Sequence, residues 1–171
     1  MLIGTPRAQA GTFMHELGHN LGLHHGGADD LQYKPNYLSV MNYAFQQSGL
    51  IMNASQGNFD YSRFTLTNLN ESGLDEAIGV ITKTVVITTA SVITREYGTY
   101  WYCDTTLRST NTADKIDWNC NNVITDTQVI KDVNRDTLTE TLASQNDWAV
   151  LVYVGGAIGK PGASLNLPAV T

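Results

Sequence analysis

Apolar side chains recur with helical spacing between residues 10 and 23. At about 100° per residue they fall on one side of a helix, and His15, His19 and Gly22 fall on the other. The apolar set is Ala10, Phe13, Met14, Leu17 and Leu21. We therefore expect a helix over 10–23 that buries its apolar side and turns the histidines into a cleft. Gly22, followed by Gly26 and Gly27, lets the chain turn sharply at the end of the helix.

The rest of the chain predicts loops and strands. Residues 26–37 and 53–72 are polar and loop-like. Residues 38–45 form only a short segment between these loops, and residues 74–80 predict one short helical turn. Residues 84–94 are rich in Val, Ile and Thr, which favours a strand or hairpin arm. The aromatic stretch 97–102 could continue that sheet. Residues 148–154 predict a second strand that two glycines end, and the tail from 159 looks irregular.

These elements indicate one α+β domain over 1–171, with the helical part in 1–60 and a β-rich part in 61–171. The 171 residues are 42% hydrophobic and 15% charged, which suits a globular domain rather than a disordered one. The net charge of −6, with only ten scattered Lys and Arg, argues against a nucleic-acid surface and suits cation binding. No apolar run approaches the ~18 residues that span a bilayer.

The cysteine content of the chain favours a secreted protein. Cys103 and Cys120 are its whole thiol inventory, and an even count in a Thr- and Asn-rich chain fits one extracellular disulfide. Two unrelated buried thiols are the alternative. The first residues lack the pattern of a signal peptide. Because the histidine motif begins as early as His15, we expect the chain to be the back part of a longer precursor.

Residues 15–25 read HELGHNLGLHH, which fits H-E-x-x-H-x-x-G-x-x-H. Histidines at i and i+4 share one helical face, so His15 and His19 can reach a single Zn²⁺. Gly22 lets the backbone swing away, so that His25 returns as a third ligand, although His24 is an alternative. Glu16 lies beside the metal, where it can act as a general base toward an activated water. Five fixed positions with three histidines should arise by chance on the order of once in 10⁵ such chains or fewer.

The extended motif resembles the metzincin clan of zinc metallopeptidases. The sequence Ser39-Val40-Met41-Asn42-Tyr43 is similar to the Met-turn of that clan, in the form found in astacins and serralysins. The resemblance implies that Met41 forms a hydrophobic floor beneath the metal and that Tyr43 stabilises the oxyanion. Plain core packing is the alternative for Met41, and a buried phenol for Tyr43.

Residues 33–45, YKPNYLSVMNYAF, also resemble a group of uncharacterised secreted prokaryotic metzincins. The resemblance is strongest over 8–45 and implies a zincin-like catalytic domain. Metzincins build the upper wall of the cleft from a sheet that precedes the active-site helix, whereas only fourteen residues precede His15 here. Either later strands such as 84–94 replace that wall, or the sheet subdomain is truncated.

The sequence thus predicts a zinc endopeptidase that acts on peptide or protein substrates with Glu16 as base. A non-catalytic adhesion or structural module that keeps a structural metal is the alternative, and a zinc hydrolase for a non-peptide bond is a third reading. The motif leaves substrate preference and oligomeric state open.

A weak internal repeat favours calcium as a second metal. The pattern D-x-N-x-[DN] occurs twice, fifteen residues apart, and alternating side-chain oxygens are how loops collect ligands for a hard cation. Neither segment is an EF-hand loop, and such turns also occur without metal. The candidate ligands are Asp117, Asn119, Asn121, Asp132, Asn134 and Asp136.

Overall fold

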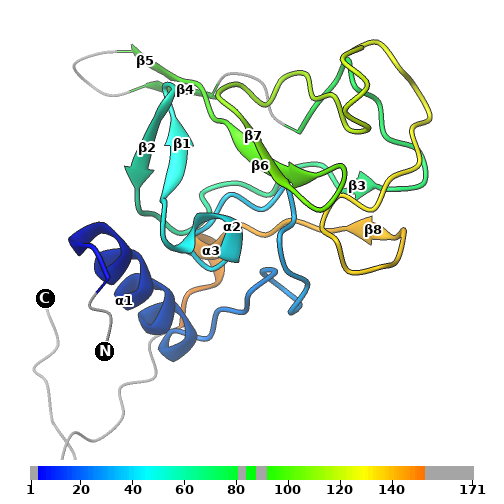
Figure 1. The fold of residues 1–171 in the computed structure, drawn as a ribbon. Coiled ribbons are helices and arrows are strands. Elements are labelled where there is room, and N and C mark those ends of the chain that lie inside the picture. Colours follow the sequence, from blue (N-terminus) through cyan, green and yellow to red (C-terminus); the bar gives the residue numbers. More distant parts are fainter. Residues whose placement is uncertain (1–3, 81–83, 88–91, 153–171) are drawn as a thin grey trace, which may run out of the picture.

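The structure is a computed structural model that describes residues 4–80, 84–87 and 92–152. In the described part of the chain, two helices are followed by eight short strands and a last short helix (Figure 1). In order they are α1 (Pro6–Asn20), α2 (Tyr43–Gln46), β1 (Leu50–Met52), β2 (Ser55–Asn58), β3 (Leu69–Asn70), β4 (Thr84–Ile87), β5 (Val92–Arg95), β6 (Thr99–Tyr102), β7 (Leu107–Thr110), β8 (Thr141–Leu142) and α3 (Asp147–Val150).

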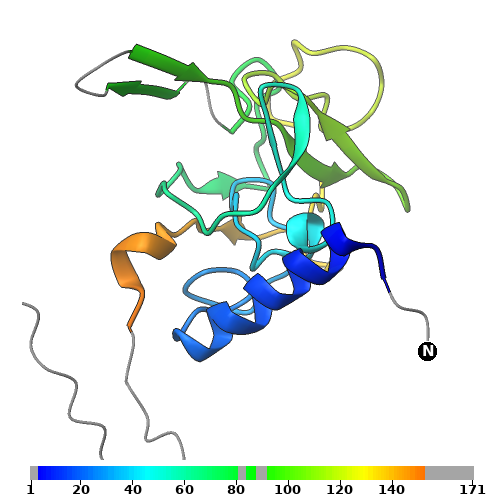
Figure 2. The ribbon, with the colours of Figure 1, turned by 90° about the vertical axis from the view of Figure 1, so that its left-hand side faces the viewer.

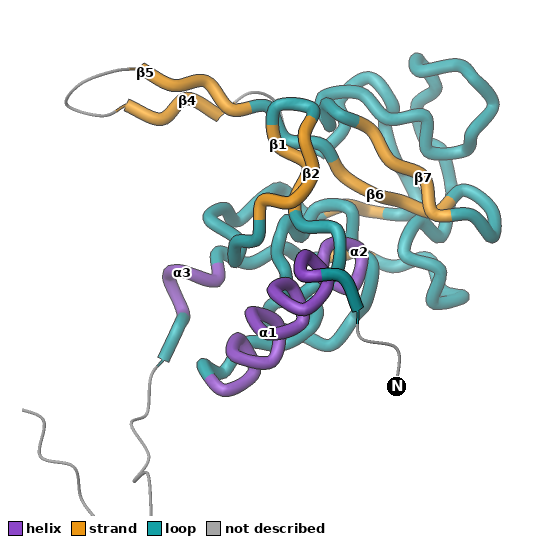
Figure 3. The backbone as a smooth tube through the Cα atoms, turned by 60° about the vertical axis from the view of Figure 1, so that its left-hand side comes forward, coloured by secondary structure: helices purple, strands orange, loops and turns teal. Residues whose placement is uncertain are grey.

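The described strands form four separate antiparallel pairs: β1–β2, β3–β8, β4–β5 and β6–β7. The predicted hairpin over 84–94 is confirmed, because β4 pairs with β5 in the register Thr84↔Arg95. In Figures 1 and 3 this hairpin projects away from α1, so it does not form the wall of a cleft over the helix. The strands nearest the start of α1 are β1 and β2, where Arg7 donates to the carbonyl of Gln56.

Four other predictions from the pattern were wrong. The stretch 97–102 does not extend the first hairpin, because β6 pairs with β7 instead. Residues 53–72 contain β2 and β3, and 74–80 forms a turn and a bridge from Leu74 to Val129 rather than a helix. Residues 147–150 form α3, while 153–154 and the tail from 159 lie outside the described residues. The segment is helical because the backbone carbonyl of Asp147 accepts from the amide of Leu151, four residues later. The Asp147 side chain is buried and anchors the start of this helix.

Helix α1 begins where the sequence provides a cap and ends in a Schellman motif. The Thr5 hydroxyl accepts from the Ala8 amide, and Pro6 occupies the first helical position. At the other end Leu23 donates to the carbonyl of Gly18 and Gly22 donates to that of His19, with Gly22 at φ +84°. The helix therefore begins four residues before the predicted range and ends three before its end.

The buried side of α1 is not the predicted one: of the five apolar residues, Met14 and Leu21 are partly buried and the other three are exposed. His15 is 1% exposed and Gly11 and Gly18 are buried, whereas Phe13 and Leu17 are 69% and 40% exposed. A Cβ at Gly11 would overlap the carbonyl oxygen of Gln46. The helix therefore packs through its small residues and its histidine, which allow the backbone to approach closely.

Figure 2 shows α1 on the lower side of the molecule, below the strands. The buried apolar residues form three clusters. The largest surrounds Trp101, Trp118 and the Cys103–Cys120 disulfide. The second lies around Phe45 and Ile51. The third lies against α1 and contains Leu23, Tyr37, Val40, Met41 and Tyr61. Among the described residues, no helix has the length and apolar character to cross a membrane.

Candidate metal centre

Three histidines converge on one point beside α1. The Nε2 atom of His19 lies 3.2 Å from Nε2 of His15 and 3.1 Å from Nε2 of His25. Within the described part of the chain, these are the three His, Cys, Asp or Glu side chains whose ligand atoms all lie within 4.8 Å of one another. His15 and His19 come from successive turns of α1, and the turn at Gly22 returns the chain so that His25 faces them.

Backbone carbonyls orient two of the rings. Nδ1 of His15 lies 3.0 Å from the carbonyl oxygen of Val40, and Nδ1 of His19 lies 3.0 Å from that of Leu23. A carbonyl can only accept a hydrogen bond, so each Nδ1 carries the proton and each Nε2 of a neutral ring presents a lone pair. This is how proteins commonly orient histidines that ligate a metal.

The electrostatic environment favours neutral rings. Burial lowers the pKa of His15 below its ordinary 6.5, and the neighbouring His19 lowers it further, against the opposing bond to Val40. Burial, followed by the charges of His19 and His15, also lowers the pKa of His25. Both imidazoles are therefore in the form that can donate a lone pair at neutral pH.

Glu16 and Tyr43 border the three histidines. Glu16 is exposed on α1, and its negative charge acts on both His15 and His25. The ring of Tyr43 stacks on His15 with centroids 5.3 Å apart and lies 4.7 Å from the ring of His25. Tyr43 is 41% exposed, so it is not the buried phenol of the alternative reading. The open side of the cluster thus carries one carboxylate and one phenol.

The segment predicted as a Met-turn packs directly under the helix. Met41 is fully buried, and a Cβ on Gly18 would overlap its sulfur. The same turn supplies the Val40 carbonyl that orients His15. Sequence analysis missed this carbonyl because backbone groups leave no mark in a residue pattern.

Two buried charged residues, Asp147 and Lys34, hold the surrounding loops. The sequence analysis assigned no role to either residue. The carboxylate of Asp147 accepts from the hydroxyls of Tyr37 and Ser39, at 2.8 Å and 2.6 Å, and from the amide of Ser62. The Lys34 ammonium donates to Asp29 at 2.6 Å and to the carbonyl of Gly26, beside His25. A single acid or lysine in a mixed sequence gives no signal of burial, so only the fold identifies these roles.

His24 lies outside the cluster. Its Nδ1 is 3.3 Å from Asp30 and its side chain is largely exposed, whereas Nδ1 of His25 lies 3.8 Å from the same carboxylate. The structure thus brings together the three histidines of the motif and leaves the fourth at the surface.

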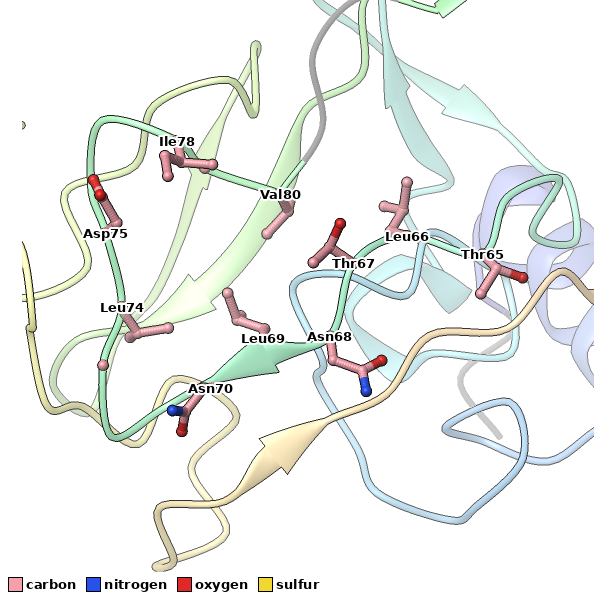
Figure 4. Close-up of a pocket in the computed structure, with 12 residues that line it drawn as sticks. Thr65, Leu66, Thr67, Asn68, Leu69, Asn70, Leu74, Asp75, Ile78 and Val80 are labelled. Atoms are coloured by element: carbon pink, nitrogen blue, oxygen red, sulfur yellow. The ribbon is translucent and has the colours of Figure 1, made fainter.

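Two hollows of similar volume lie in the described part of the molecule. One of about 500 Å³ is lined by 65–70, 73–75 and 78–80, away from all three histidines, and Asp75 is the one titratable residue in that lining (Figure 4). The other, about 530 Å³, is lined by Tyr33, Tyr43, Ala44 and 46–48. We assign the second to the site because Tyr43, which contacts His15 and His25, forms part of its lining.

The predicted disulfide is present between Cys103 and Cys120. The six candidate calcium ligands lie in two turns with the same backbone form. Asp117 accepts from the amides of Asn121 and Asn122, and Asp132 accepts from those of Asp136 and Thr137. The residues at equivalent positions of both turns have positive φ, namely Cys120, Asn122, Arg135 and Thr137.

Comparisons with protein-family models, with curated proteins and with solved structures returned no match for this chain.

Proposed function

We propose that the protein is a zinc-dependent endopeptidase of metzincin type. The observation that carries this proposal is the convergence of three Nε2 lone pairs, two of them fixed by Nδ1–H bonds to backbone carbonyls. Three such lone pairs repel one another unless a cation lies between them. The disulfide supports secretion, because disulfides persist in oxidising compartments.

The donor set fits zinc. Tetrahedral Zn²⁺ with Zn–N bonds of about 2.0–2.1 Å places its ligand nitrogens roughly 3.4 Å apart. The distances of 3.1 Å and 3.2 Å between the imidazole nitrogens are close to that separation. Three neutral imidazoles that leave one side open are also the ligand set of a catalytic rather than a structural zinc site.

A bound Zn²⁺ would supply Lewis-acid polarisation of a carbonyl and a water of lowered pKa. Within the chain, Glu16 accepts the proton of the attacking water and returns it to the leaving amine. Tyr43 donates a hydrogen bond to the developing oxyanion. The Val40 carbonyl orients His15, and the Ser39–Asp147 bond and the packing of Met41 against Gly18 hold the segment that carries Val40.

A non-catalytic module with a structural metal is the second candidate function. The exposure of Phe13 and Leu17 on α1 favours it, because an uncovered apolar side suits a surface that binds another protein. Glu16 favours the peptidase, since a structural site has no use for a base beside the metal. A zinc hydrolase for a non-peptide bond would use the same residues, so a panel of peptide and ester substrates separates these readings.

The experiment is a protease assay of the zinc-loaded chain and of Glu16→Ala. We expect Glu16→Ala to retain zinc and to lose peptidase activity by about 10²–10⁴-fold, the typical contribution of general acid–base catalysis. Asp104→Ala, which removes an exposed carboxylate elsewhere, is the charge-matched control and should keep full activity. Normal turnover by Glu16→Ala would remove Glu16 from the mechanism. A zinc-loaded chain that cleaves nothing would favour the non-catalytic module.

A further inference from the structure

Glu76 is a buried carboxylate with an unpaired oxygen. It is 0% exposed, and its Oε1 accepts from the amide of Asn119 at 3.4 Å. Its Oε2 is buried and has no hydrogen-bond partner among the described residues. Burying an ionised oxygen without a partner is costly, so this position calls for a ligand.

The backbone fixes Glu76 between the two ends of the first D-x-N-x-N turn. The Glu76 amide donates to the carbonyl of Asp126 at 3.0 Å, and its carbonyl accepts from the amide of Ile116 at 3.1 Å. Next to these bonds, Leu74 and Val129 pair in both directions. These bonds hold the backbone of Glu76 beside the turn.

Side chains in the turn alternate between the core and Glu76. Trp118 is fully buried in the largest cluster and Cys120 is anchored there by the disulfide. Between them, Asn119 reaches both acids: its amide N–H donates to Glu76, and its side chain donates to Asp126 at 3.2 Å. Asn121 donates to the same Asp126 oxygen at 2.7 Å. The two asparagine side chains thus converge on Asp126, while the backbone N–H of Asn119 binds Glu76.

The charges that act on Glu76 are acidic. Burial raises the pKa of Glu76, and the carboxylates of Asp117 and Asp126 raise it further, against hydrogen bonds that lower it. Three carboxylates at one place repel one another unless a cation neutralises them. Their oxygens, with those of the asparagine amides, are the hard donors that Ca²⁺ prefers over the nitrogen donors of a zinc site.

We propose that Glu76, Asp117, Asn119 and Asp126 bind one Ca²⁺ that clamps residues 74–76 to the turn. The ion would use Oε2 of Glu76 and oxygens of the other three, with water filling the remainder of six to eight positions. The site is separate from the three histidines and does not depend on the peptidase function. Its effect is structural, because it fastens the disulfide turn to a distant segment.

The second turn provides an internal comparison. There Glu71 holds the place of Glu76, but its two carboxylate oxygens accept from the amides of Val133 and Glu140, at 2.6 Å and 3.0 Å. Glu71 therefore has no unpaired carboxylate oxygen, in contrast to Oε2 of Glu76. Asp132, which matches Asp117 in position and in backbone bonds, is therefore a matched control.

The full chain is first stripped of metal with EDTA and then reloaded with zinc. Terbium, a luminescent substitute for Ca²⁺, is then added to test the proposal. Trp118 directly follows Asp117, so tryptophan excitation should sensitise terbium emission, and added Ca²⁺ should quench it. We expect Glu76→Gln and Asp117→Asn to weaken calcium binding by at least about tenfold, because affinity follows the number of charged ligands. Asp132→Asn should change it by less than about twofold for the same reason.

Thermal unfolding gives a second readout. Calcium should raise the melting temperature of the zinc-loaded protein, and this increase should be lost in Asp117→Asn and kept in Asp132→Asn. If Glu76→Gln does not fold, the half-buried Asp126→Asn takes its place. The proposal is overturned if zinc alone restores full stability and calcium adds none, or if Asp132→Asn abolishes binding while Asp117→Asn retains it.

Discussion

At the scale of single residues, the metal centre depends on which nitrogen of each ring carries the proton. The carbonyls of Val40 and Leu23 fix that choice for His15 and His19. The remaining nitrogens face one another at a spacing close to that of zinc ligands. Hydrogen bonds that hold a ligand ring in one orientation reduce the cost of ordering it on binding.

Metal binding should depend on pH through these rings. Because the pKa values of His15 and His25 are lowered, protons displace the metal only below the ordinary histidine pKa of 6.5. Zinc should stay bound at about pH 7 and be released as the pH falls below roughly 6. A chromogenic chelator that reports free zinc across the pH range measures this release. Zinc that remains bound at about pH 4 would count against ligation by three histidines.

The same shifts affect the metal-free protein. An unfolded chain binds more protons than the folded one between the lowered pKa values and 6.5. The free energy of unfolding should therefore fall as the pH is lowered through that window. Urea denaturation of the metal-free protein on both sides of the window provides the test of this sign.

At the scale of elements, α1 shows why an amphipathic pattern can mislead. Its apolar residues define one side, yet the helix packs through Gly11, His15 and Gly18. On that side the backbone approaches Gln46 and Met41 closely and gains dispersion contacts, while Phe13 and Leu17 stay exposed. His15 is buried on the same side, whereas His19 and His25 are only partly buried.

Gly11→Ala separates the two orientations of α1. If Gly11 were exposed, alanine would stabilise the helix by up to about 1 kcal/mol. With Gly11 against the Gln46 carbonyl, the added methyl must displace α1, and we expect a net loss of roughly 1–3 kcal/mol, as in other overpacked contacts. Urea denaturation measures the difference. Thr12→Ala, at the next and exposed position of α1, is the control and should not destabilise the protein.

At the scale of the whole molecule, short strand pairs and long loops are held by a few buried links. The disulfide joins Cys120 to Cys103, seventeen residues earlier, within the largest cluster. Asp147 and Lys34 tie distant loops to the segments that carry Tyr37 and His25. The disulfide and these buried hydrogen bonds hold the loops together, whereas a larger β protein would do so with an extended sheet.

Replacing both cysteines by serine should lower the free energy of unfolding by about 3 kcal/mol, the chain-entropy value for a loop of this length. Zinc affinity should change little, because the disulfide packs in a different cluster from Met41 and Val40. Chemical denaturation and zinc titration of the double variant give the two quantities. A parallel loss of zinc affinity would contradict this division of the molecule.

The sequence by itself determined the local features. The spacing of His15, His19, Gly22 and His25 follows from helix geometry and one glycine at φ +84°, so the residues that meet could be named from their positions alone. The paired strands within 84–95 lie close together in the sequence, so their pairing is a local feature. The disulfide could be predicted because the chain has two cysteines, which can pair in one way.

Only the tertiary structure decided which side of α1 is buried, which strands pair, and which distant groups complete each site. The Val40 carbonyl, Asp147 and Glu76 reach their partners across 25, 108 and 43 residues. Such contacts form because packing brings separate segments together, and the free energy of that packing depends on the whole core rather than on a local pattern. The periodicity of 10–23 records which residues are apolar, but the shape of the partner surface decides which of them are covered.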